Sequence, residues 1–193
     1  SKCTDQELVE KFVKGDKVCM QELIKRHKDR VYTYILLIVK NPHVADDLFQ
    51  DTFIKVINSL KRNKYKDQGR FLSWVIRIAH NLTIDYFRKG KTQQTYSNDD
   101  GEMDLFNSSK FSDSNAEEDM IDEQITKDVR YLIDKLPKDQ KQVVLMRHYG
   151  NLSFKEIAEQ TGVSINTALG RMRYALINLR KLMETHQVNL LKN

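Results

Sequence analysis

This chain contains little of what membrane-spanning, secreted or metal-binding proteins need. Its 193 residues include two cysteines, Cys3 and Cys19, and neither has a His or Cys neighbour at the spacing of a metal-ligand set. The longest apolar run, residues 34–39, is far too short to cross a membrane. Residues 1–5 lack the apolar core of a signal peptide. We therefore expect a reduced, cytoplasmic protein without membrane insertion, metal site or other cofactor.

The sequence also lacks the patterns that mark enzyme active sites. Its five histidines are scattered from His27 to His186 and form no paired motif, and its seven glycines form no phosphate-binding loop or nucleophile elbow. Apolar residues nowhere alternate with polar ones at the period of a strand, and they recur instead at helical spacing. These absences make an enzyme the least favoured class and predict an all-α fold.

Charge is distributed unevenly along the chain. Residues 1–90 carry 18 Lys or Arg against 11 Asp or Glu, and residues 127–193 carry 12 against 6. Residues 91–126 carry 2 against 10. Two basic blocks therefore flank an acidic bridge, and basic blocks are typical of nucleic-acid binding.

Residues 151–176 have the pattern of a helix-turn-helix. Ser153 and Glu156 form a capping box that opens a short helix, and Gly162 can take the positive φ of a tight turn. Ser164 then caps a longer helix whose first turns are polar and basic, which suits the major groove of B-DNA. The candidate contacts to duplex DNA are Ser164, Asn166, Thr167, Gly170, Arg171 and Arg173.

A purely structural helical hairpin is the alternative to this DNA-binding motif. Ala158 lies where two helices can cross closely, and Gly162 follows it at the spacing that such a crossing requires. We expect the basic side chains to lie on the free face of the second helix, because its large apolar residues turn inward. Those apolar residues are Ile165, Leu169, Met172, Leu176 and Leu179. We therefore favour DNA binding over the structural hairpin.

Capping and stop residues divide the chain into two helical domains and a linker. The N-terminal helices are expected from the Thr4–Glu7 capping box to Gly15, from about Asp16 to Asn41, from about His43 to Leu60, and from Arg70 to about Lys89, ended by Gly90. Residues 91–114 are too polar to build a core and are interpreted as a flexible acidic linker. A second block begins near residue 115, breaks at Leu136–Pro137 and resumes from Asp139 to Tyr149. The expected domains are residues 1–90 and 115–193.

The fourth helix follows a basic loop, and it interleaves cationic residues with aromatic ones. Such a surface suits single-stranded DNA, because phosphates meet Lys or Arg while unstacked bases meet rings and amides. Trp74 shares an apolar stripe with core positions, so a mainly structural role is favoured for it. The candidate contacts in the loop and helix are Lys64, Lys66, Arg70, Phe71, Trp74, Arg77, His80, Asn81, Arg88 and Lys89.

Five segments resemble sigma factors of the extracytoplasmic-function group of the bacterial sigma-70 family. They are residues 5–9 (Asp-Gln-Glu-Leu-Val), 44–53 (Val-Ala-Asp-Asp-Leu-Phe-Gln-Asp-Thr-Phe), 71–85, 136–147 and 152–158. They occur in the family's order and spacing, and together they extend over nearly the whole chain apart from the linker. A helix-turn-helix alone is weak support for a family, whereas this ordered set is strong.

The resemblance implies a role for each part of the chain. Residues 46–53 bind the clamp helices of the largest catalytic subunit of core RNA polymerase, the 61–71 loop and the following helix bind and open the −10 promoter element, and the helix-turn-helix reads the −35 element. Asn81 matches a position that contacts a flipped base. The polymerase-binding candidates are Asp46, Asp47, Leu48, Gln50, Asp51 and Phe53. Asp47 and Gln50 are expected to be exposed, while Leu48 and Phe53 divide between core and interface. An anti-sigma factor is the expected regulator.

The chain departs from the family pattern in the second helix of the helix-turn-helix. Many members carry a basic or polar residue and then Ser before the Arg that follows the helix's Thr, but here Leu169 and Gly170 precede Arg171. Glycine inside a helix costs up to about 1 kcal/mol relative to alanine, yet it lets a backbone approach DNA closely. The −35 preference therefore does not follow from the resemblance.

The main rival is a two-domain regulator that recruits or blocks polymerase without replacing a sigma factor. Such a protein would carry a ligand pocket, a phosphoacceptor domain or a dimer seam in its N-terminal part, and the sequence indicates none. The acidic stretch from Asp99 to Glu123 is a solvated tether by default. The resemblance suggests that it threads through polymerase, and its charge could cover the basic DNA-binding faces of the free protein.

Overall fold

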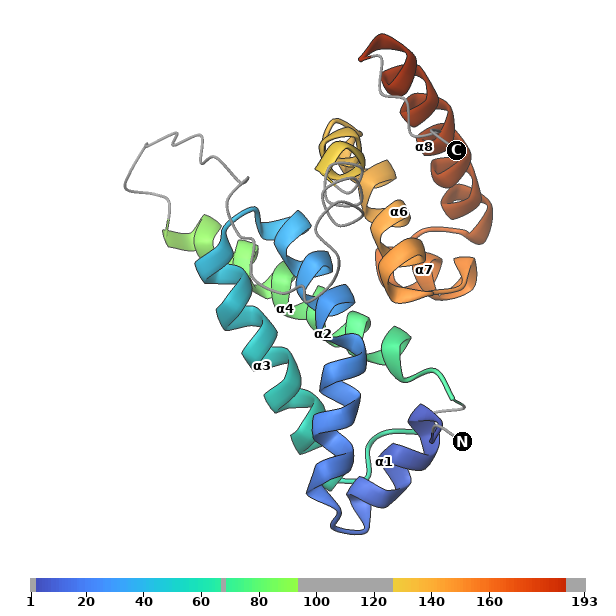
Figure 1. Cartoon of the computed structure of the whole chain (residues 1–193). Helices are drawn as coiled ribbons and strands as arrows, with labels where there is room; N and C mark the ends of the chain where they lie inside the picture. The colour runs from blue at the N-terminus through green and yellow to red at the C-terminus, as the bar shows by residue number, and fades with distance from the viewer. Residues whose placement is uncertain (1–2, 67–68, 94–126, 187–193) are drawn as a thin grey trace, which may run out of the picture. The chain divides into compact units, whose positions relative to one another are not determined.

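The computed structural model describes residues 3–66, 69–93 and 127–186, with the side chains of 91–93 left aside. Every regular element in these ranges is a helix, which confirms the all-α prediction (Figure 1). The helices form two compact units, one made by the four N-terminal helices and the other by the helices after residue 127.

The N-terminal unit is a bundle of α1 (Asp5–Val13), α2 (Lys17–Val39), α3 (Pro42–Lys61) and α4 (Phe71–Gln93). The long helix α2 packs against each of the other three, and α3 also packs along α4. The core is apolar and closed, with Leu23, Val31, Ile35, Val56, Leu60, Val75 and Ile76 almost completely buried. Burial of each such side chain contributes roughly 1.5–3 kcal/mol before the entropy of folding is subtracted.

The predicted ends of the first three helices are confirmed. Thr4 caps α1 in a complete capping box with Glu7, and Asp16 caps α2. Asn41 caps α3, where Pro42 occupies the first turn and needs no hydrogen-bond acceptor for its nitrogen. The prediction for the end of α4 is wrong, because the helix continues through Gly90 to Gln93. Gly90 lacks the positive φ of a helix-ending glycine, so it is an ordinary interior position.

The acidic linker and the start of the second helical block lie outside the described residues. These predictions concern residues 94–114, the charged positions from Asp99 to Glu123, and a helix beginning near residue 115. The described part of the second unit starts at residue 127. The boundaries of the two domains and of the linker therefore stay predictions.

The C-terminal unit contains a helix over residues 127–134, then α6 (Lys138–Gly150), α7 (Phe154–Thr161) and α8 (Ile165–Thr185). The predicted break at Leu136–Pro137 is confirmed, and Pro137 directly precedes α6. Leu132, Leu145, Met146, Leu152 and Ile157 are almost completely buried in this unit.

The helix-turn-helix is formed by α7 and α8. Ser153 caps α7 in a capping box with Glu156, and Gly162 ends that helix at φ +68° in the left-handed region. Ser164 then caps α8, its Oγ accepting a hydrogen bond from the Thr167 amide at 3.1 Å. The sequence therefore predicted both caps and the turn correctly.

The predicted inward face of α8 is wrong. Ile165, Leu169 and Leu176 are all exposed, and Met172 and Leu179 are only half-buried. The fully buried positions of this helix are Ala168 and Ala175. Their small side chains allow close helix packing, so the larger residues on either side of them are displaced toward solvent.

Candidate nucleic-acid interface

The N-terminal half of α3 presents an acidic face. Asp46, Asp47, Gln50 and Asp51 are exposed, as expected for Asp47 and Gln50, and their spacing keeps them on adjoining parts of the helix surface. Asp46 accepts a hydrogen bond from the Tyr32 hydroxyl. The pKa of Tyr32 is raised, first by burial and then by the charge of Asp46.

Two residues assigned to polymerase contact do not lie on that surface. Leu48 and Phe53 are both buried, which corrects the expectation that they divide between core and interface. The Phe53 ring packs edge-on against Phe49 with centroids 4.9 Å apart. Helical periodicity explains the error, because these two positions share the inward stripe with Val56 and Leu60.

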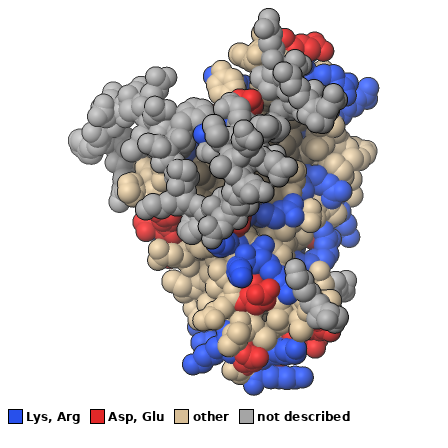
Figure 2. All heavy atoms as spheres, viewed as in Figure 1, with Lys and Arg blue, Asp and Glu red and all other residues tan. Residues whose placement is uncertain are grey.

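The loop between α3 and α4 is basic and has an unusual backbone. Lys64, Lys66 and Arg70 are exposed in it. Asn63 takes φ +53° and Gly69 takes φ +82°, so the loop makes a turn that few residues adopt without strain. Figure 2 shows Lys and Arg side chains gathered at the lower end of the view, the region where Figure 1 places the ends of α1 and α3.

Aromatic rings hold this loop against α4. The Tyr65 and Trp74 rings lie 4.3 Å apart between centroids, and Phe71 lies 6.1 Å from each of them. Trp74 is half-buried, in keeping with a structural role, whereas Phe71 is fully buried. The prediction that Phe71 contacts DNA is therefore corrected: its ring anchors the loop and does not reach the surface.

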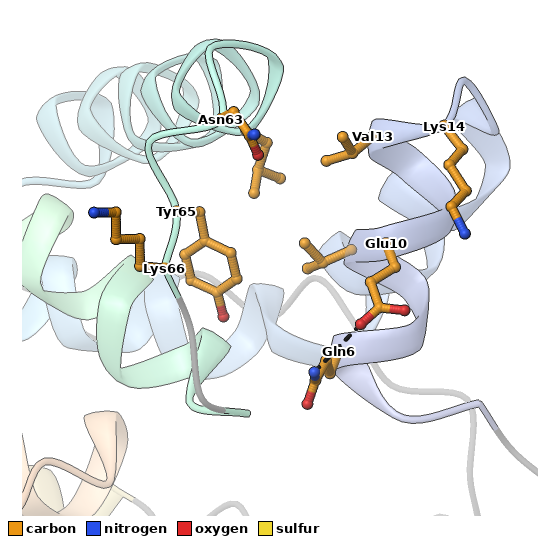
Figure 3. Close-up of a pocket in the computed structure, with 9 residues that line it drawn as sticks. Gln6, Glu10, Val13, Lys14, Asn63, Tyr65 and Lys66 are labelled. Carbon is orange, nitrogen blue, oxygen red and sulfur yellow. Dashed lines mark hydrogen bonds between the residues drawn. The ribbon is translucent and has the colours of Figure 1, made fainter.

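A cavity of about 370 Å³ lies between the loop and α1. Figure 3 shows Tyr65 standing between the two walls, with Gln6 and Glu10 of α1 opposite. Gln6 Nε2 donates to Glu10 Oε1 at 3.3 Å. The lining combines amides, a carboxylate and the ammonium groups of Lys14 and Lys66 over an apolar floor. No sequence motif indicates that α1 faces this loop.

His80 belongs to the core and not to the DNA-facing surface. It is 4% exposed, and its Nδ1 forms a hydrogen bond with the Tyr34 hydroxyl at 2.9 Å, the donor depending on the tautomer. Burial lowers the pKa of His80 to about 4, so the ring is neutral near pH 7. The prediction that His80 contacts DNA is therefore corrected.

The remaining candidates on α4 lie on its outer side. Asn81, Arg88 and Lys89 are exposed, and Arg88 pairs with Asp85 at 3.0 Å. Arg77 is half-buried, and its Nε is a buried donor without a hydrogen-bond partner in the described part of the chain. The exposed side chains of α4 are therefore polar or basic at Asn81, Arg88 and Lys89 and apolar or aromatic at Ile84, Tyr86 and Phe87.

The first turns of α8 are polar, but their residues divide between two faces. Asn166 and Arg173 are exposed, and a side chain at Gly170 would meet open space. Ser164 and Thr167 share a hydrogen bond of 2.9 Å between their hydroxyls at the exposed start of the helix. Arg171 differs from the others, because it pairs with Asp139 of α6 at 2.9 Å. The expectation that Arg171 lies on the free face is therefore wrong.

Neither a metal site nor a membrane span is present in the described part of the chain. Among the described residues, no three His, Cys, Asp or Glu side chains are grouped as a metal site would require. Within the same ranges, no helix combines the length and apolar character needed to span a membrane.

Comparison with known proteins gives matches over both units. The family Sigma-70 region 2 matches residues 23–93, and the family Sigma-70, region 4 matches residues 126–174. The chain is 30% identical over 176 residues to the ECF RNA polymerase sigma factor SigE of Mycolicibacterium smegmatis, covering 89% of this chain and 65% of SigE. It is 27% identical over 175 residues to the RNA polymerase sigma factor CarQ of Myxococcus xanthus, covering 91% of this chain and 95% of CarQ.

Solved structures share the fold. The sigma factor RpoE of Bartonella quintana, in complex with the anti-sigma factor NepR, matches with a TM-score of 0.61 at 15% identity. The match covers 85% of this chain and 96% of RpoE.

Proposed function

We propose, from the membership of this chain in the extracytoplasmic-function group of the sigma-70 family, that it directs core RNA polymerase to promoters and opens the −10 element. The observation that carries this proposal is that two separate units each contain an element whose chemistry suits DNA. One is a basic loop on an aromatic support, and the other is a helix-turn-helix with an exposed recognition helix. Catalysis of RNA synthesis belongs to the polymerase.

Core polymerase binds the acidic face of α3. Asp46, Asp47, Gln50 and Asp51 offer carboxylates and an amide that can meet basic residues of the polymerase clamp. Because these groups are exposed, they act mainly by orienting the two proteins and by raising the rate of association. Their effect decreases as the salt concentration rises. Leu48 and Phe53 support this face from inside the unit.

Strand opening takes place on the loop and α4. Taking a base out of the duplex costs a few kcal/mol, and stacking and hydrogen bonds between the protein and the flipped base must offset this cost. The exposed amide of Asn81 supplies a donor and an acceptor for a base edge. Lys64, Lys66 and Arg70 hold phosphates of the separated strand. The Tyr65–Trp74 contact supports this function by fixing the loop on α4.

The recognition helix α8 enters the major groove of the −35 element. Its start carries the hydroxyls of Ser164 and Thr167, and the first N–H groups of a helix, which have no intrahelical acceptor, attract phosphate oxygens. Asn166 and Arg173 lie on its exposed side, where they can reach base edges. Reading both elements requires the two units to engage one promoter together.

An anti-sigma factor regulates the chain. The support is that RpoE of Bartonella quintana shares this fold and was solved with the anti-sigma factor NepR. The rival function, a regulator that leaves a resident sigma factor in place, differs in one measurable respect. It would not support initiation by core polymerase alone.

Transcription in vitro with purified core polymerase and this chain tests the proposal. We expect start sites downstream of a shared −35 and −10 pair, identified by sequencing the transcripts.

Asp47→Lys with Asp51→Lys should weaken core binding, whereas the matched reversal Asp29→Lys, at an exposed position of α2, should not. Asn81→Ala should lower permanganate reactivity of unpaired thymines more than core binding. Transcription that requires another sigma factor would favour the regulator.

A further inference from the structure

Two side-chain contacts fix the rotation of α8 in its unit. Arg171 pairs with Asp139 at 2.9 Å, and Asn178 Nδ2 donates to Gln140 Oε1 at 2.8 Å. Both partners lie in the first turn of α6, and the two α8 residues are seven positions apart, which places them on the same side of the helix. Ala168 and Ala175 are fully buried on that side. The side facing α6 and α7 is therefore assigned without ambiguity.

The opposite side of α8 follows from helical geometry. Successive side chains are about 100° apart, so the positions opposite the middle of the side that carries Ala168, Arg171, Ala175 and Asn178 can be identified. Leu169 is 44% exposed there and Leu176 is 51% exposed, with Arg173 between them along the helix. The residues of this outward face are Asn166, Leu169, Gly170, Arg173, Leu176 and Ile177.

The N-terminal part of the outward face carries an amide, an apolar side chain and a guanidinium group. A recognition helix places its N-terminal residues deepest in the groove, so Asn166, Leu169 and Arg173 are the outward side chains best placed to reach bases. Gly170 has no side chain, and open space lies where one would be. This leaves Leu169 unshielded beside the groove floor. The only apolar group that a base offers in the major groove is the C5 methyl of thymine.

We propose that Leu169 determines the −35 preference of this chain by contacting a thymine methyl, with Asn166 and Arg173 as its polar flanks and with Arg171 acting only to orient the helix. The inference rests on the proposed function, because it presumes that α8 enters the −35 major groove. It assigns specificity to an apolar residue that the sequence pattern had placed in the core. It also removes Arg171 from the base-reading set.

The test pairs a methyl on the protein with a methyl on the DNA. The full chain bound to core polymerase is used to select promoters from a library with a randomised −35 region. Each thymine of the selected element is then replaced in turn by deoxyuridine, which lacks only the C5 methyl. At one thymine we expect about a fourfold loss of affinity, which is the equivalent of one buried methyl at about 0.8 kcal/mol.

Variants assign that loss to one side chain. Leu169→Ala should make the holoenzyme insensitive to deoxyuridine at the same position, and Leu169→Met should keep the sensitivity. Leu176→Ala is the matched control, because Leu176 lies on the same face about 10 Å further along the helix and should leave the methyl effect unchanged. Both leucines are exposed, so these changes leave the core intact.

The outcomes separate the inference from the proposed function. If the selection returns no preferred −35 sequence, the duplex-reading function of α8 fails and the inference fails with it. If a −35 element is selected but no deoxyuridine substitution matters, or Leu169→Ala keeps the methyl effect, the function stands and Leu169 is not the reader. Arg171→Met should leave the selected −35 sequence unchanged. A changed preference at one base pair would instead show that Arg171 contacts a base.

Discussion

Acidification should destabilise the N-terminal unit through His80. This ring is buried with its Nδ1 against the Tyr34 hydroxyl, and its pKa is lowered to about 4. In the unfolded chain the pKa of a histidine is about 6.5, so the unfolded state binds more protons between these two values. The contribution of His80 to the free energy of unfolding is therefore fully present above pH 6.5. It decreases as the pH falls from 6.5 to about 4, and it no longer changes below that pH.

The size of the effect follows from the difference between the two pKa values. Proton binding to the unfolded state alone should lower the free energy of unfolding by about 2 kcal/mol between pH 7 and pH 5. Urea unfolding followed by tryptophan fluorescence measures it, because Trp74 is the single tryptophan and lies in the same helix as His80. The midpoint should shift to lower urea at pH 5 while the slope stays constant.

A double variant isolates the contribution of this pair. Tyr34→Phe with His80→Leu removes both partners, whereas His80→Leu alone leaves a buried hydroxyl unsatisfied and costs about 1–3 kcal/mol. All other ionisable groups of the chain remain in the double variant. Between pH 7 and pH 5 the free energy of unfolding of the double variant should fall by about 2 kcal/mol less than that of the unchanged chain. Equal pH dependence in both proteins would refute the burial of a neutral His80.

Two further expectations concern the helix-turn-helix. Gly162→Ala should lower the stability of the C-terminal unit by about 1–2 kcal/mol because φ is +68°, while Gly170→Ala, at a helical position with open space, should raise it by up to about 1 kcal/mol. Thermal unfolding followed by circular dichroism measures both, and the same sign for both would contradict the assigned backbone. A double-mutant cycle of Arg171→Met and Asp139→Ala should give a coupling below about 1 kcal/mol, since Asp139 is 60% exposed. A coupling several times larger would mean that the pair does more than orient α8.

The sequence predicted what depends on local chemistry. Capping boxes, the turn glycine Gly162 and the break at Asn41–Pro42 between α2 and α3 each act through their own backbone or through neighbours within four residues, so they could be recognised without a structure. Helical periodicity was enough to predict an all-α fold, and the five segments that resemble sigma factors were enough to predict the family.

The errors concern side chains whose orientation depends on distant partners. Leu169 looked like a core residue because it repeats at helical spacing, but Ala168 fills the close contact instead. Arg171 looked free because Asp139 lies far away in sequence, in another helix. His80 was predicted to contact DNA because its buried partner Tyr34 belongs to another helix, α2, and could not be identified from the sequence. Periodicity identifies a stripe on a helix, whereas only the packed neighbours decide which stripe faces inward.

The all-alanine contact of α8 has a consequence for how promoter preference can change. Ala168 and Ala175 are the fully buried residues of α8, and Asp139 and Gln140 contact its Arg171 and Asn178, so none of these positions needs to touch DNA. Substitutions at Asn166, Leu169 and Arg173 are correspondingly uncoupled from folding. If these three residues read bases as proposed, duplicate copies of such a gene could diverge at three codons and acquire separate sets of target genes while the scaffold of the unit stays the same.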